Sequence, residues 1–135
     1  MYLLDTNVIS ELRKTKPHGA VIAWLRSVSG KDLFIPAVAI GEMQAGVERT
    51  RLQAPEKALE IERFIDRVLS SYSVLPLDAV TFREWARLLH GKSRDLTEDA
   101  MVAATARIHG MAVVTRNVKD FAAFDVEVFN PFTGK

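Results

Sequence analysis

Short apolar runs alternate with longer amphipathic segments along the chain, and this alternation most restricts the fold. Runs of this length predict strands at residues 2–4, 33–35, 74–77, 111–115 and 126–129. Strands that are joined through helices lie parallel, with the helices covering both faces of the sheet. The sequence therefore predicts an α/β fold, a three-layer α/β/α sandwich around a central, mostly parallel sheet of four to five strands.

Helical periodicity fills the segments between these runs, with proline, glycine and polar residues at the ends. Helices are expected at residues 8–15, 20–28, 37–49, 56–72, 79–89 and 98–108, with a short one around Phe121. The helix at 79–89 is expected to bury Val80, Phe82, Trp85 and Leu88 or Leu89. Pro76 has no N–H to give to a neighbouring strand, so the third strand is expected at an edge or to end there.

The first apolar run stops on a carboxylate. Tyr2 to Leu4 have the pattern of a buried strand, and Asp5 is its expected last residue because helical periodicity begins at Val8. In open parallel sheets, ligands bind in the crevice at the carboxyl ends of the strands. Asp5 is therefore a candidate functional residue, although the same position suits a helix N-cap and that interpretation stays open.

Two further acids lie on apolar faces of expected helices. Glu42 has Val38, Ala39, Ala45 and Gly46 as its helical neighbours, and Asp99 has Leu96, Val102, Ala103 and Ala106. Burying an isolated ionised carboxylate costs several kcal/mol, roughly, so such a group is usually neutralised, paired or bound to a cation. The nearby chain offers no matching buried lysine or arginine, which favours a site over a structural ion pair.

A fourth acid, Asp120, follows the fourth strand in the segment Thr115 to Phe121. Asn117 as an N-cap, with Asp120 in the first turn, would make an ordinary helix start. If the first and fourth strands are neighbours, however, Asp5 and Asp120 meet in the same crevice. The net charge is +1, so four clustered carboxylates would leave +5 (+1 less −4) on the rest of the molecule, which suits a polyanionic partner.

These segments together resemble the PIN-domain ribonucleases, and most closely the VapC/FitB-like toxins of toxin-antitoxin systems. The matching segments are Asp5–Ser10, Glu42, Asp99–Ala106, Thr115–Asn117 and Asp120–Phe121. Met101 stands where the family often has leucine or isoleucine. The resemblance implies that Asp5, Glu42, Asp99 and Asp120 form the acidic site, supported by Thr6 and Asn117, although the extra acids Asp95 and Glu98 lie close to Asp99.

An all-oxygen ligand set without cysteine suits a hard cation, Mg²⁺ or Mn²⁺. Such ions activate water and stabilise charge during phosphodiester hydrolysis, so no nucleophilic side chain is needed. The resemblance implies an RNA substrate, a small antitoxin partner and a homodimer. The helices at 37–49 and 56–72 are expected to form an apolar clamp for that antitoxin, with the core as the alternative place for their apolar residues.

Basic residues on several helices could contact phosphates, although most charges on helices only face solvent. They are Arg49, Arg51, Arg63, Arg67, Arg83, Arg87, Lys92 and Arg94. The three histidines, His18, His90 and His109, lie outside every motif.

The composition narrows the remaining possibilities. A chain of 135 residues is expected to form a single PIN-like nuclease domain over residues 1–135. The absence of cysteine excludes a disulfide framework and thiolate metal sites. No targeting signal and no apolar run of about 20 residues is found, so we expect a cytoplasmic protein without a membrane partner.

Two other function classes fit parts of the pattern. A catalytically silent PIN-like module would keep the acidic pocket only to bind a partner. A Mg²⁺-binding receiver domain of a signalling protein also has an aspartate at a strand end and a threonine after its fourth strand. It would need paired acids after the first strand and a lysine after the fifth, whereas this chain has the single Asp5 and then Val126 to Phe129 with no lysine.

Overall fold

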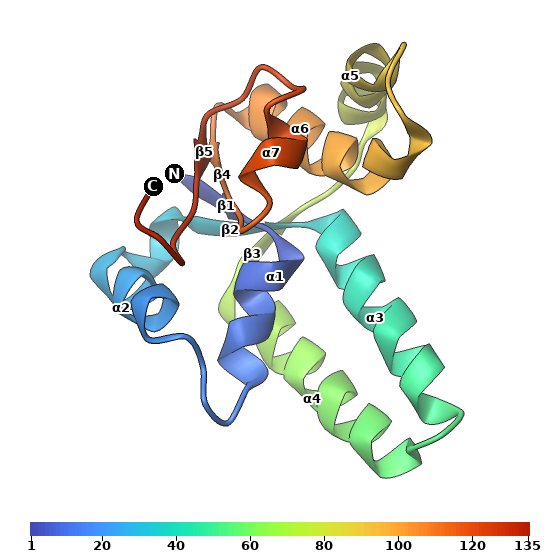
Figure 1. The fold of residues 1–135 in the computed structure, drawn as a ribbon. Helices are drawn as coiled ribbons and strands as arrows, with labels where there is room; N and C mark the ends of the chain where they lie inside the picture. The colour runs from blue at the N-terminus through green and yellow to red at the C-terminus, as the bar shows by residue number, and fades with distance from the viewer.

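The computed structural model describes all 135 residues and contains one five-stranded sheet (Figure 1). The strands follow the order β3-β2-β1-β4-β5, and every neighbouring pair is parallel. Their bounds are β1 Tyr2–Leu4, β2 Leu33–Pro36, β3 Ser73–Leu75, β4 Ala112–Val114 and β5 Val128–Phe129. β3 is an edge strand that ends one residue before Pro76, as the sequence predicted.

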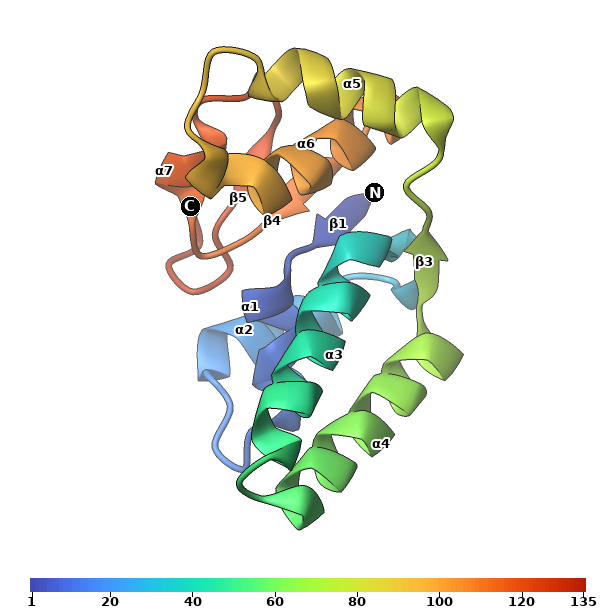
Figure 2. The same ribbon diagram turned by 90° about the vertical axis from the view of Figure 1, so that its right-hand side faces the viewer.

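Seven α-helices connect and cover these strands. Their bounds are α1 Thr6–Ile9, α2 Gly19–Ser27, α3 Ala37–Arg51, α4 Pro55–Ser71, α5 Ala79–Leu89, α6 Thr97–His109 and α7 Val118–Phe121. Figure 2 shows α5 and α6 on one side of the strands and α1 to α4 on the other. The predicted three-layer α/β/α arrangement is confirmed.

Each sheet face has its own hydrophobic core because successive strand residues point to opposite faces. Leu4 and Val114 pack into a cluster with residues of α1 to α4. Leu3 and Val113 pack into a second cluster with residues of α5, α6 and α7. All four side chains are fully buried. Because the central strands are covered on both faces, their sequences are continuous apolar runs rather than alternating ones.

The central pair β1 and β4 positions the acidic residues. Leu3 lies beside Val113 and Leu4 beside Val114, so both strands end at the same level. The Asp5 N–H then donates to the Val114 carbonyl at 2.9 Å. The first and fourth strands are therefore neighbours, which is the condition for Asp5 and Asp120 to share one crevice. Asp5 and the segment after β4 leave the sheet side by side.

Two local predictions differ from the structure. The expected helix at 8–15 is a short α-helix followed by a 3-10 helix, Ser10–Arg13. In α5, Leu89 is buried as expected, but Val80 and Phe82 are 57% and 42% exposed and Thr81 is buried in their place. The helical period locates an apolar stripe but does not decide which edge of that stripe the neighbouring helix covers.

No helix of the protein combines the length and the apolar composition that crossing a bilayer requires.

Candidate active site

Asp5 is buried where β1 meets α1, with 5% of its surface exposed. Its Oδ1 accepts a hydrogen bond from the Thr6 N–H at 2.9 Å, and its Oδ2 accepts one from the Thr115 hydroxyl at 2.8 Å. Burial raises the pKa of Asp5, and the charge of Asp120 adds to this, while the two hydrogen bonds oppose it. Asp5 is also the N-cap of α1, so the capping interpretation and the site interpretation describe the same carboxylate.

Glu42 lies on α3, half-buried, beside α1. Its Oε1 accepts a hydrogen bond from the Thr6 hydroxyl at 3.1 Å. Burial raises the pKa of Glu42, the Thr6 bond lowers it, and the charges of Asp5 and Glu98 raise it further. Thr6 therefore touches two of the acids, since its N–H serves Asp5 and its hydroxyl serves Glu42.

Asp99 lies in the first turn of α6, half-buried, and accepts no hydrogen bond from another side chain. Burial raises its pKa from 3.8 to about 7, and the charges of Asp5, Asp120, Glu42 and Glu98 contribute in that order. It is the acid whose ionisation the fold opposes most clearly, because neither a cation nor a donor compensates its charge.

Asp120 is exposed on α7, and its charge raises the pKa of both Asp5 and Asp99. Asn117 is at the N-cap position of α7, but its side chain makes no capping hydrogen bond. Its backbone N–H donates to the Thr115 hydroxyl oxygen at 3.0 Å. The predicted support from Asn117 therefore reaches Asp5 only through its backbone and Thr115.

Thr115 and Asn7 are the supporting residues that the sequence analysis did not single out. Thr115 is fully buried, and its hydroxyl donates to Asp5 while it accepts from the Asn7 side-chain amide at 3.3 Å. Asn7 Oδ1 accepts the Arg116 N–H at 3.1 Å. Thr115 directly follows β4 and Asn7 lies in the short helix after β1, so both are polar residues close to the end of an apolar strand. Only the pairing of β1 with β4 shows that they meet.

A cavity of about 600 Å³ lies between α3 and α6, and Glu42 is the one predicted site acid that lines it. Its lining residues are Thr6, Val38, Gly41, Glu42, Ala45, Arg49, Glu98 and Met101. Glu98 of α6 is thus a further acid of this cleft, across from Glu42 of α3. Arg49 is the single basic residue among the lining residues.

The acids are close enough to raise one another's pKa, yet no three Asp, Glu or His side chains are grouped tightly enough to hold one metal ion. Mg²⁺ usually keeps several of its waters and is held by one or two carboxylates together with substrate phosphates. These carboxylates, with their raised pKa values and their wide spacing, therefore suit a hard cation that keeps part of its water shell. They do not form a site in which protein atoms alone surround the metal.

Glu11 shows that burial alone does not identify such a site. Its side chain is as buried as that of Asp5, at 3% exposed. However, the hydrogen bond from the Lys14 ammonium group, together with the His18 N–H, lowers its pKa. Glu11 is paired with a cation and is a structural acid. Asp5, Glu42 and Asp99 have no cation partner, and the neutral donors that Asp5 and Glu42 do have leave their pKa values raised.

Comparison with known proteins decides the family. The family described as PIN domain matches residues 2–127. The chain belongs to the PIN-domain family. The resemblance drawn from the sequence to the VapC/FitB kind of PIN domain is also confirmed by individual relatives.

Two relatives match this PIN domain over nearly its whole length. Toxin FitB from Neisseria gonorrhoeae is 36% identical over 139 residues, covering 98% of this chain and 99% of FitB. VapC ribonuclease Y4jK from Sinorhizobium fredii is 34% identical over 145 residues, covering 98% of both chains.

Solved structures agree with this PIN fold. The crystal structure of FitAcB from Neisseria gonorrhoeae has a TM-score of 0.84 at 36% identity, covering 98% of this chain and 99% of that chain. A structure of FitAB bound to a DNA fragment has a TM-score of 0.83 at 37% identity, covering 98% and 96%.

Proposed function

We propose that this PIN domain is a divalent-metal-dependent endoribonuclease and the toxin of a toxin-antitoxin pair. The observation that carries the proposal is a set of three carboxylates without a cation partner. Asp5 follows β1, Glu42 lies on α3 and Asp99 lies on α6, and each has a raised pKa. Two relatives that match nearly the whole of this PIN domain are named a toxin and a ribonuclease.

Asp5, Glu42 and Asp99 would hold Mg²⁺ or Mn²⁺, directly or through water, and Asp120 would support a second ion or the attacking water. When bound, such an ion lowers the pKa of a coordinated water and stabilises charge on the phosphodiester. The Thr115 and Thr6 hydroxyls fix the orientation of Asp5 and Glu42. Because the Asp99 pKa is about 7, this carboxyl would release a proton when the cation binds near neutral pH.

Of the two other function classes, the receiver domain is excluded. Receivers have the sheet order 2-1-3-4-5, whereas here β1 lies between β2 and β4. A silent binding module would have the same fold and the same acids, so only activity distinguishes it from a nuclease.

The test is RNA cleavage in Mg²⁺ or Mn²⁺ and in EDTA, by the wild type and by Asp5→Asn, Glu42→Gln and Asp99→Asn. We expect cleavage only with metal, and a loss of at least about a hundredfold in each variant, beyond the range for residues that merely support a ligand. Asp66→Asn is the matched control, because Asp66 is an exposed acid on α4 outside the site. Full activity in EDTA would overturn the metal role, and RNA binding without cleavage would favour the silent module.

We also propose an antitoxin partner and a homodimer for this chain, on the basis of the FitAB and FitAcB relatives. The predicted clamp needs correction, because Phe64, Ile65 and Val68 of α4 lie in the core. Leu69 of α4 stays 47% exposed and remains available to a partner. A smaller cavity of about 260 Å³ also lies between α1, α3 and α4. Its lining residues are Thr6, Ser10, Arg13, Glu42, Met43, Gly46, Thr50, Ile61 and Phe64. A partner segment bound there would contact Glu42 and so block the proposed active site.

A further inference from the structure

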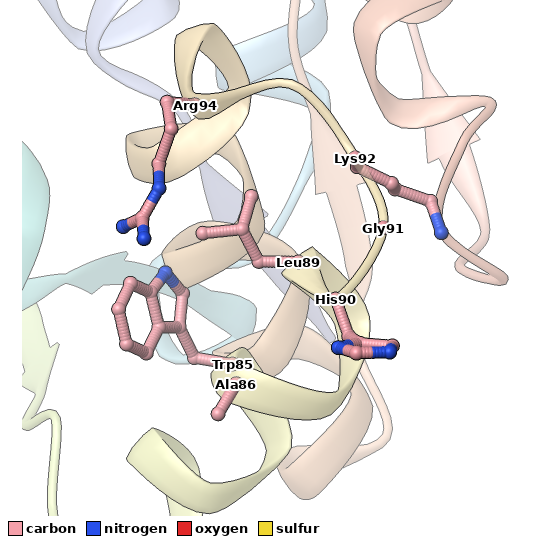
Figure 3. Close-up of a pocket in the computed structure, with 7 residues that line it drawn as sticks. All are labelled: Trp85, Ala86, Leu89, His90, Gly91, Lys92 and Arg94. Carbon is pink, nitrogen blue, oxygen red and sulfur yellow. The ribbon is translucent and has the colours of Figure 1, made fainter.

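A separate pocket of about 320 Å³ lies where α5 ends and the loop to α6 begins (Figure 3). Its volume is at the lower end of ligand pockets, roughly 300–1,000 Å³. The lining residues are Trp85, Ala86, Leu89, His90, Gly91, Lys92 and Arg94. No acid is among them, in contrast to the cleft that holds Glu42 and Glu98.

An aromatic ring and two cations line this pocket, and the Lys92 ammonium group also lies 5.9 Å from the centre of the Phe124 ring. Figure 3 shows Arg94 and Trp85 on one side of Leu89, with the Arg94 side chain directed toward the indole, and Lys92 on the other side. Arg94 and Lys92 are exposed, and neither forms an ion pair. Gly91, at φ +77°, makes the turn that separates the two cations from the end of α5.

Two features tie the pocket to the acidic cleft. The Trp85 indole N–H donates to the Thr97 carbonyl at 3.1 Å, which fixes the ring against the first residue of α6. Thr97 is two residues from Asp99. The 3-10 helix Arg94–Leu96 leads directly into the same helix end. The pocket and Asp99 therefore lie at the same end of α6, on different sides of the helix, and a single strand bound across Asp99 would pass around this helix end to reach the pocket.

We propose that this pocket is a subsite for one nucleotide of single-stranded RNA, beside the site of cleavage. The base stacks on the Trp85 ring, and the flanking phosphates contact Arg94 and Lys92. Aromatic stacking plus cationic backbone contacts is the usual way in which proteins hold single strands without reading their sequence. The identity of the ligand as RNA rests on the proposed nuclease function, whereas the stacking and charge arguments rest on the pocket alone.

The test measures binding of a short, fluorescein-labelled 2′-O-methyl oligoribonucleotide by anisotropy in EDTA. These conditions prevent both attack by a 2′-hydroxyl and metal-dependent hydrolysis, so binding is read separately from cleavage. Arg94→Gln and Lys92→Gln should each weaken binding and reduce the slope of log affinity against log salt by about 0.7. Arg26→Gln is the matched control, because Arg26 is an equally exposed arginine on α2, across the sheet.

Trp85→Leu should weaken binding about 5- to 150-fold without changing the salt slope. Trp85→Phe loses the hydrogen bond to Thr97 but keeps an aromatic ring, so it should retain most of the affinity. A purely structural role of Trp85 would make both variants equally weak. If Arg94→Gln, Lys92→Gln and Arg26→Gln bind alike, the subsite is refuted, whatever the cleavage assay shows. Loss of binding in the first two, in a protein that cleaves no RNA, would retain the subsite and refute the nuclease.

Discussion

Replacing Asp99 with asparagine should stabilise the metal-free protein near neutral pH. The fold raises the pKa of Asp99 from 3.8 to about 7, a difference of about three pH units. At about 1.4 kcal/mol per unit this corresponds to about 4 kcal/mol, and because the side chain is only half-buried we halve it to about 2 kcal/mol. For a domain of this size that is a rise of about 8 °C in melting temperature.

The sign of the pH dependence follows from proton uptake. Between pH 3.8 and about 7 the folded protein holds a proton on Asp99 that the unfolded chain has lost. The contribution of Asp99 to the free energy of unfolding is therefore fully present below pH 3.8 and is lost as pH rises through about 7. The melting temperatures of Asp99→Asn and wild type should coincide near about pH 4 and separate fully above about pH 7.

Calorimetric melts in EDTA across this range provide the measurement. Glu11→Gln is a control of opposite sign, because the Lys14 ammonium group lowers the pKa of Glu11, and its loss should destabilise the protein at neutral pH. In wild type, about 10 mM Mg²⁺ with an affinity of about 1 mM should add about 1.4 kcal/mol, and Asp99→Asn should gain less. Equal melting temperatures at every pH, or equal gains from Mg²⁺, would refute the reasoning.

Two further outcomes are expected. Thr115→Val should lower the free energy of unfolding by about 1–3 kcal/mol in urea titrations, because it leaves Asp5, Asn7 and Asn117 without their shared hydroxyl. Thr115→Ser should retain most of the stability, and an unchanged valine variant would contradict the network. The chain purified from its native host should carry a small antitoxin and behave as a dimer by light scattering. A lone monomer would count against both proposed partners.

Several features were predictable because they depend on neighbours in the sequence. Strand and helix periodicities gave the three-layer α/β/α class, and Pro76 marked the edge strand. The end of the first apolar run placed Asp5 at the carboxyl end of a strand, and lone acids on small, apolar helix faces pointed to Glu42 and Asp99. A local pattern is sufficient for these, since one turn or one strand determines which face a side chain occupies.

The remaining features depend on residues far apart in the chain. The Thr115 hydroxyl meets Asp5 across 110 positions only because β4 pairs with β1 in register. Burial did not separate the two kinds of acid, because Glu11 and Asp5 are equally buried, yet Glu11 meets Lys14 and the His18 N–H while Asp5 meets the charge of Asp120. The sequence by itself determined which faces are apolar and which residues carry charge. Only the tertiary structure decided which charges face one another, because electrostatic energy depends on distances and solvent exposure that long-range packing sets.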